Sequence, residues 1–309
     1  MEALNVKNTS NTMSPKTDDC QSRVVRHCDG RWESLNPEIL ALIFTRLTAE
    51  ERIGVLSCVC QSWALCLHGP YCWAEIDIEQ WCRKMDRTIF QVDSAVRKLV
   101  RRSKGTVRRL TAFKVGDAGF AYVSNCGRFL KVLKMPMSDV TDKIVERQAS
   151  SLANLTVLDI SYCLKITCKG IAAFGKNCKA LVHLRRNMPV PEVLPTYNMT
   201  VMNTKPHDSE AMIIADTMPG LQHLELCYGR FSDIGLDTIF AKCNALTHLD
   251  IRGCWSVKLD GHLEDRCFQL QQFKSPWHDE FDNLTSSESG SDGADDGADS
   301  DEEFSSDLD

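Results

Sequence analysis

The sequence lacks long apolar runs. No stretch approaches the roughly 18 consecutive apolar residues of a membrane-spanning helix, so we expect no spanning segment. The first twenty residues, MEALNVKNTSNTMSPKTDDC, contain no apolar core either, so we expect no signal peptide. Without export, the 15 cysteines are expected to stay reduced. These absences argue against a secreted, disulfide-stapled domain, and the cysteines need another explanation.

The motifs of common enzymes are also missing. We find no phosphate-binding Walker loop, no G-x-G-x-x-G, no H-E-x-x-H and no G-x-S-x-G. No paired cysteine or histidine motif has the spacing of a zinc site. We therefore predict a non-catalytic protein with no cofactor and no metal ion.

Charge is divided unevenly along the 309 residues, whose formal net charge is −6. Residues 279–309 contain 13 acidic side chains and no lysine or arginine, whereas residues 1–278 contain 36 basic and 29 acidic side chains. We predict that residues 278–309 form a disordered acidic tail and that residues 1–31 are disordered too. The tail is a solubilising appendage, an interaction tail or a phosphorylated segment. Its candidate phosphorylation sites, each followed by an acidic residue three positions later, are Thr285, Ser289, Ser300 and Ser306.

Residues 32–76 have the pattern of three short helices. Asn36-Pro37 is a helix start, because asparagine caps free amides and proline fits the first helical position. A second helix starts at the capping box Thr48 to Glu51 and carries apolar residues to Val59; a third ends at Gly69-Pro70. Three helices in about 40 residues are too small for a full core, so we expect a partner to cover their apolar face. The first helix carries the apolar stripe Ile39, Leu40, Ile43, Phe44 and Leu47.

The segment WESLNPEILALIFTRLTAEERIGVLSCVCQSWALCLHGPYCW resembles an F-box domain. The matching elements are Leu35, then Pro37-Glu38-Ile39-Leu40, then Ile43-Phe44 and Leu47, then Val59, Cys60 and Trp63, and finally Pro70 and Trp73. Asn36 interrupts the usual Leu-Pro pair of this family. The following PYCWAEIDIEQW is similar, more particularly, to plant F-box proteins with leucine-rich repeats.

This resemblance implies docking on the Skp-type adaptor of an SCF-type cullin-RING ubiquitin ligase, and through it on the cullin and the RING subunit. We expect Pro37, Ile39, Leu40, Ile43, Phe44, Val59 and Trp63 to be partly exposed on the free module. The alternative is that these residues form an ordinary internal core. The residues that the resemblance assigns to adaptor binding are Leu35, Pro37, Ile39, Leu40, Ile43, Phe44, Leu47, Val59, Cys60 and Trp63.

Residues 107–277 contain an internal repeat of the form L-x-x-L-x-L. Successive repeats start 23 to 26 residues apart, apart from one spacing of 40. A period in the twenties with this pattern predicts leucine-rich repeats, each a strand followed by a helix. The predicted fold class is therefore α/β: a three-helix F-box followed by a short solenoid with a parallel concave sheet and convex helices. The starts are Val107-Leu110, Leu130-Leu133-Met135, Leu155-Leu158-Ile160, Leu181-Leu184, Leu221-Leu224-Leu226, Leu246-Leu249-Ile251 and Leu270-Phe273.

Several cysteines recur at fixed positions of these repeats. Cys178, Cys243 and Cys267 precede the first leucine of a repeat by three residues, and Cys163 and Cys254 follow the central leucine by five. The arrangement resembles the cysteine-containing class of leucine-rich repeats. We expect these thiols to act as small buried apolar groups rather than as metal ligands or catalytic thiols.

The residues beside each central leucine point out of the core, because side chains alternate along a strand. Three neighbouring strands should stack His183, His223 and His248 at about 4.8 Å per strand. The same surface is a set of solvated polar side chains, a pH-sensitive partner-binding stripe or a metal site. The candidate substrate-binding residues are His183, Arg185, His223, Glu225, His248 and Asp250.

Two segments interrupt this regular plan. Residues 77–106 are predicted to be a bridging helical segment or an irregular capping repeat. The 40-residue spacing implies an inserted loop at about 187–208, either a recognition loop or simple disorder. Near the joint lies a basic cluster that is a solvated face, a nuclear-import signal or a polyanion-binding patch, formed by Arg97, Lys98, Arg101, Arg102, Lys104, Arg108 and Arg109.

Together these features lead to one main hypothesis and two alternatives. The main hypothesis is a substrate-recognition adaptor of an SCF-type ubiquitin ligase that presents a protein substrate for ubiquitination and degradation, located in nucleus and cytoplasm. The alternatives are a binding scaffold that uses leucine-rich repeats without degradation, and a nucleic-acid-associated protein that uses the 97–109 cluster.

Overall fold

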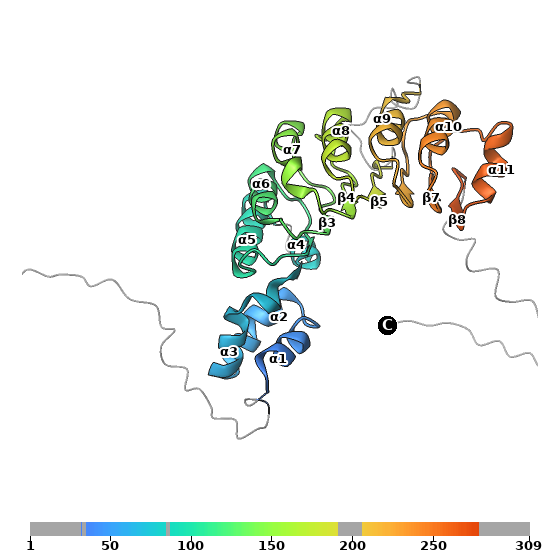
Figure 1. Ribbon diagram of the computed structural model, residues 1–309. Coiled ribbons are helices and arrows are strands. Elements are labelled where there is room, and N and C mark those ends of the chain that lie inside the picture. The colour runs from blue at the N-terminus through green and yellow to red at the C-terminus, as the bar shows by residue number, and fades with distance from the viewer. Residues whose placement is uncertain (1–31, 33–34, 85–86, 191–205, 278–309) are drawn as a thin grey trace, which may run out of the picture.

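A computed structural model of the chain describes residue 32 and residues 35–84, 87–190 and 206–277. Figure 1 shows a small helical unit that leads into a curved array, with the strands on the inside of the curve and the helices on the outside. The predicted α/β class, with short helices followed by a solenoid of parallel strands and convex helices, is confirmed. None of the helices in the described ranges is long and apolar enough to cross a membrane.

The helical unit begins where the sequence predicts. The side chain of Asn36 accepts a hydrogen bond from the amide of Glu38 (2.7 Å), and Thr48 and Glu51 form a reciprocal capping box. The second helix is shorter than predicted: it ends at Gly54, and a 3-10 turn follows. The unit consists of α1 (Pro37–Phe44), α2 (Ala49–Gly54), η1 (Leu56–Cys58), α3 (Gln61–His68) and η2 (Pro70–Trp73).

The sheet has eight parallel strands, and each strand pairs with its neighbours in chain order. The central leucines are in register, as in the pairs Leu110–Leu133 and Leu133–Leu158. Short strands follow from the repeat itself, since three residues suffice to bury one leucine and turn its neighbours outward. The strands are β1 (Glu75–Asp77), β2 (Arg109–Thr111), β3 (Val132–Lys134), β4 (Val157–Asp159), β5 (His183–Arg185), β6 (His223–Glu225), β7 (His248–Asp250) and β8 (Gln272–Lys274).

Helices cover the convex side, with one helix after most strands (Figure 1). The helices α8 and α10 start at the amide-capping residues Thr167 and Ser232. The short helix α4 (Glu79–Lys84) follows β1, and the convex helices are α5 (Ile89–Arg102), α6 (Asp117–Cys126), α7 (Asp142–Gln148), η3 (Ala149–Leu152), α8 (Cys168–Asn177), α9 (Ser209–Thr217), α10 (Asp233–Lys242) and α11 (His262–Phe268).

The strand β1 is absent from the predicted repeats. Residues Glu75 to Asp77 pair with Arg109 to Thr111, so the sheet starts some thirty residues before the first predicted repeat. Residues 77–106 were predicted to be a bridging helical segment or an irregular capping repeat; they contain α4 and α5 and lie between the paired strands β1 and β2. A capping box at Thr88 and Gln91 starts α5, which buries Val92, Val96 and Val100. The first strand of the sheet therefore follows directly after the helical unit.

One continuous apolar core runs from the helical unit to the last repeat, through Leu40, Trp73 and the central leucines. The five cysteines at recurring repeat positions are all within it, as predicted. Burial raises the pKa of the thiols of Cys163, Cys178 and Cys254 to about 12, which keeps them protonated and unreactive. These thiols serve as packing groups.

A ladder of aspartates connects successive helices. Asp142 accepts hydrogen bonds from the amides of Thr167 (2.8 Å) and Gly170 (2.9 Å), at the start of the next helix. Asp208 does the same for Ser232 (2.7 Å) and Gly235 (3.1 Å). Asp93, Asp117 and Asp233 make equivalent bonds to the following repeat. This ladder satisfies helix-start amides that would otherwise lack acceptors.

Several predicted features lie outside the described residues. They are the N-terminal segment 1–31, the acidic tail 278–309 with its candidate phosphorylation sites, and the middle of the insertion, residues 191–205.

Candidate interaction surfaces

The helical unit carries a concentration of exposed apolar side chains. On α1, Ile39 is 49% exposed, Leu42 69% and Ile43 41%. On the neighbouring helices, Val55 and Leu65 are also exposed. Of the 18 exposed large hydrophobic residues in the described ranges, eight lie between residues 32 and 71. Such a patch is typical of a protein-binding surface.

Part of the expected contact set lies inside the unit instead. Leu40 and Phe44 are each 1% exposed, and Cys60 is also buried, so the expectation that Leu40 and Phe44 are partly exposed is wrong. They pack into the unit's own core, where the Phe44 ring meets Trp63 edge-on at 5.1 Å. Pro37, Ile39 and Ile43 are exposed and Val59 and Trp63 half-buried, which agrees with the expected partial exposure. Leu35 and Leu47 are half-buried too.

Leu42 and Leu65 were not among the residues that the F-box resemblance assigned to adaptor binding. Both side chains, 69% and 63% exposed, are nevertheless more exposed than those of Ile39 and Ile43. The sequence did contain a signal for Leu42. The helix PEILALIF is apolar on more than one face, and a helix of that kind needs a second covering surface. The apolar docking face is therefore defined here by Ile39, Leu42, Ile43, Val55 and Leu65.

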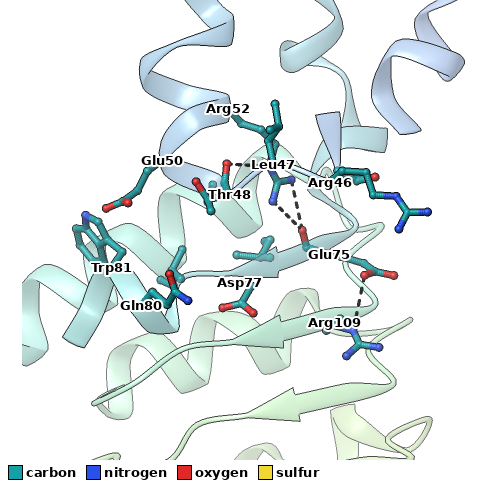
Figure 2. Close-up of a pocket in the computed structure, with 14 residues that line it drawn as sticks. Arg46, Leu47, Thr48, Glu50, Arg52, Glu75, Asp77, Gln80, Trp81 and Arg109 are labelled. Atoms are coloured by element: carbon teal, nitrogen blue, oxygen red, sulfur yellow. Dashed lines mark hydrogen bonds and ion pairs between the residues drawn. The ribbon is translucent and has the colours of Figure 1, made fainter. Parts of the chain in front are cut away.

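A buried arginine holds the F-box to the sheet (Figure 2). Arg52 of α2 is 3% exposed, and its guanidinium donates hydrogen bonds to the carbonyls of Cys72 and Glu75. It also lies over the Trp73 ring, 4.9 Å from the ring centre. Burial lowers the pKa of Arg52, but an arginine remains charged at neutral pH. This contact fixes the orientation of the docking face relative to the solenoid.

The concave surface brings the predicted histidines together. His183, His223 and His248 pair in register on β5, β6 and β7. Their rings stack, with centroids 5.1 Å apart for the first pair and 3.9 Å for the second. Burial, together with the nearby His248 and His183, lowers the pKa of His223. The central imidazole of the stack therefore binds a proton less readily than a free histidine does.

Charged side chains lie beside this histidine stack. Arg185 donates from Nε to Glu225 (2.8 Å), and Nε2 of His183 is 3.7 Å from the same carboxylate. The pKa of Glu225 lies below its usual range: burial opposes this shift, but the nearby imidazole of His183, the charge of Arg185 and a hydrogen bond from Asn187 outweigh it. Arg185 and Glu225 remain partly exposed and available to a partner.

Asp250 differs from the expectation that it lines the surface as an exposed contact. It is 8% exposed because its carboxylate is already occupied by the guanidinium of Arg252 and by the thiol of Cys227. These bonds hold its pKa below the usual range although burial alone would raise it. The Asp250 carboxylate lies below the surface, where it forms ion pairs with Arg252 and Lys274. These two basic side chains are more exposed than Asp250.

Two neighbouring tyrosines follow the strands β4 and β6 and were not predicted. Tyr162 and Tyr228 each lie four residues after a central leucine and adopt left-handed backbone angles (φ 62° and 58°). The Tyr228 ring occupies the space beside Gly253, where any Cβ would collide with it. Large aromatic side chains next to polar groups are frequent anchors of protein interfaces.

The basic cluster 97–109 is exposed on the helix α5 and the segment after it. All seven of its side chains reach solvent, and Arg109 makes an ion pair with Glu75 at 3.7 Å. In the described parts of the chain, no group of three histidine, cysteine or acidic side chains is placed to hold a metal ion. The stacked imidazoles lie face to face and do not converge on one point.

Comparison with known proteins agrees with this geometry. Residues 32–75 match the F-box domain. The chain is 38% identical to the F-box protein FBW2 of Arabidopsis thaliana over 244 residues, which cover 79% of this chain and 72% of that relative. It is 30% identical to the Arabidopsis F-box protein SKIP19, over 77% of this chain and 74% of that relative. It is also 30% identical to the Arabidopsis putative F-box/LRR-repeat protein 23, over 77% of this chain and 51% of that relative.

Proposed function

The chain belongs to the plant family of F-box proteins with leucine-rich repeats, and we propose that it captures a protein substrate on its repeats for ubiquitination and degradation. As an F-box protein of the SCF type it is a substrate adaptor that binds a Skp-type subunit. F-box proteins are typically non-catalytic subunits. The chemistry of ubiquitin transfer then belongs to the rest of the ligase, and this chain contributes proximity and orientation.

The apolar docking face supports adaptor binding through α1. Ile39, Leu42 and Ile43 form an exposed apolar surface. Contact of this surface with water is unfavourable, and a partner that covers it would remove this cost. Leu40, Phe44 and Cys60 shape this face from inside without touching a partner. The adaptor reaches the cullin and the RING subunit in turn. Adaptor docking through α1 is proposed from this single observation, the exposed apolar patch on the F-box.

The concave surface supports substrate binding. His183, His223, His248, Arg185 and Glu225 present stacked rings and both signs of charge, which suits a polar protein segment. Because Arg52 joins the F-box to the sheet, the substrate is held at a defined orientation to the ligase. Rigid placement raises the effective concentration of substrate lysines near the charged conjugating enzyme.

The test is co-purification of the adaptor with two exposed-site variants. We expect Ile39→Asp with Leu42→Asp to weaken adaptor binding roughly 100-fold or more, since two apolar contacts are lost. Leu164→Asp, an exposed leucine of the solenoid (47% exposed), is the matched control and should bind normally. Leu40 is unsuitable for this purpose because its replacement would disturb the core. Normal binding by the double variant would contradict adaptor docking through α1.

The substrate arm uses the same purification with the proteasome inhibited, followed by mass spectrometry. A His223→Ala, His248→Ala variant should retain the adaptor and lose the captured substrate. If the same proteins are captured and degraded with the variant as with the parent chain, the concave surface is not the substrate site. If the captured proteins do not accumulate when the proteasome is inhibited, the protein is a scaffold without a role in degradation.

We also propose that the protein occurs in nucleus and cytoplasm, supported by the exposed basic cluster 97–109, which has the composition of an import signal. Exclusion of a fluorescent fusion from the nucleus would contradict this.

A further inference from the structure

A groove runs between α2 of the F-box and α5 of the first repeat, outside the concave surface. It encloses about 730 Å³ and is lined by apolar parts of Ile53, Trp81, Phe90 and Leu99. Phe90 is 86% exposed and Ile53 41% exposed, so much of this apolar wall faces water. An open groove of this kind fits an apolar side chain from another segment.

The rim of the groove is mainly basic. Arg87, Lys98 and Arg102 line it, against one carboxylate, that of Glu50. The Nε donor of Arg87 is shielded from solvent and has no hydrogen-bond acceptor among the described residues. Such a donor is poorly satisfied until an acceptor arrives. The groove therefore fits a segment that combines large apolar side chains with neighbouring carboxylates.

The chain contains such a segment at its own C-terminus. We propose that residues 301–309, DEEFSSDLD, bind in the groove, with Phe304 and Leu308 on the apolar wall and the flanking carboxylates facing the basic rim. Carboxylates and guanidinium groups form strong charge-assisted hydrogen bonds, and Arg87 supplies a donor that lacks a partner. The contact would be an intramolecular one between the two ends of the molecule.

Chain length distinguishes this segment from the other acidic aromatic one, at Phe281. The eight strands span about 34 Å from β1 to β8 at 4.8 Å per strand. Phe281 is only four residues beyond Trp277, the last described residue, and reaches at most about 14 Å. Phe304 is 27 residues beyond it, with an extended reach of about 90 Å. Only the distal segment reaches the groove within one chain.

Zero-length carbodiimide cross-linking of the full chain tests this proposal, because it joins a carboxylate only to a lysine in direct contact. Equal amounts of ¹⁴N- and ¹⁵N-labelled chain are mixed at low concentration and the products are mapped by mass spectrometry. We expect Lys98 to join a carboxylate of residues 301–309 in products of a single isotope. Phe304→Ala with Leu308→Ala should lower this yield roughly tenfold or more, since apolar burial is lost.

The matched control is Phe281→Ala with Leu284→Ala, which removes the other apolar pair of the tail and should leave the Lys98 product unchanged. Mixed-isotope products would show that the groove takes the tail of a second copy, and would overturn the intramolecular contact. If the Phe304, Leu308 variant gave the same cross-linking yield, charge alone would hold the tail near Lys98. That result would overturn the proposal that residues 301–309 bind in the groove through Phe304 and Leu308. So would a Lys98 product no more abundant than that of Lys131, an exposed lysine outside the groove.

Discussion

The imidazole of His223 lies between two others on the concave surface. Its neighbours are His183 at a centroid distance of 5.1 Å and His248 at 3.9 Å, with Glu225 beside them. A proton on His223 would be partly desolvated and repelled by any charge on the flanking rings. The carboxylate of Glu225 offsets this only in part, since the pKa of His223 remains lowered.

This lowered pKa leads to a prediction about stability. The unfolded chain binds a proton at this histidine near pH 6.5, before the folded chain does. The unfolding free energy of the parent protein should therefore fall as pH drops from about 7.5 to 5.5, by linkage. His223→Gln should flatten this dependence, measured by urea unfolding at both pH values. Parallel pH dependence in parent and variant would show that His223 does not titrate abnormally.

At the residue level, the sequence predicts which side chains of each strand point into the core and which point outward. It does not predict whether an apolar side chain packs inside the protein or is left for a partner to cover. The histidine stack follows directly from the repeat register, and the structure places it as predicted. Leu40 and Phe44 were predicted to be partly exposed, but both are buried. Helical periodicity identifies an apolar stripe without showing whether that stripe packs against the protein's own core or against a partner. The contacts of Arg52 join segments more than twenty residues apart and have no local pattern.

The repeating units are joined by carboxylates as well as by apolar packing. Asp142 occupies the first position of α7 and accepts bonds from Thr167 and Gly170 of the next unit. A Cβ at Gly170 would lie 2.6 Å from this carboxylate, so a glycine is required there. Asp208 and Gly235 repeat the pair, with a corresponding distance of 2.7 Å. The ladder has a gap at α8, whose first residue is Cys168.

We predict that Asp142→Ala lowers the unfolding free energy by about 1–3 kcal/mol, because several amide donors lose their acceptor. Gly170→Ala should act in the same direction by displacing the carboxylate. The control is Asp139→Ala, which removes an exposed ion pair with Lys165 and should cost about 0–1 kcal/mol. Urea unfolding measures all three. Equal effects of the Asp142 and Asp139 substitutions would mean that the ladder adds nothing beyond surface charge.

At the level of elements, seven strands could be predicted because each carries a leucine pattern in phase with the next. The strand β1 could not, since its sequence EID contains a single apolar residue, Ile76, and follows the F-box directly. Its place in the sheet depends on pairing with β2, which is a tertiary contact. The aspartate ladder is likewise visible in the sequence only once the repeat boundaries are known.

The whole described molecule shares one apolar core, and this has a consequence for unfolding. The core includes Phe44 of α1, Val96 of α5 and Leu249 of β7 without interruption. A short array coupled to its neighbours at every step is expected to unfold as a unit, whereas long arrays lose this cooperativity.

We predict that the F-box and the solenoid unfold together. In a Trp255→Phe, Trp277→Phe variant, every remaining tryptophan lies between residues 32 and 81, so fluorescence reports on the F-box end. The fluorescence transition should coincide with the circular dichroism transition of the whole chain in urea. Two separated midpoints would show that the F-box is an independent folding unit, and that Arg52 does not couple the two parts.

The consecutive order of the strands also bears on how such a molecule can change its length. Among the described residues, each strand pairs with its neighbours in the sequence, and the ladder aspartates accept hydrogen bonds from the following unit. Duplication or loss of one complete unit would therefore leave every other junction intact, and would move the C-terminal end by about 4.8 Å along the stack. Unequal exchange between related genes could alter the reach of the concave surface in such steps while the adaptor-binding end stayed the same.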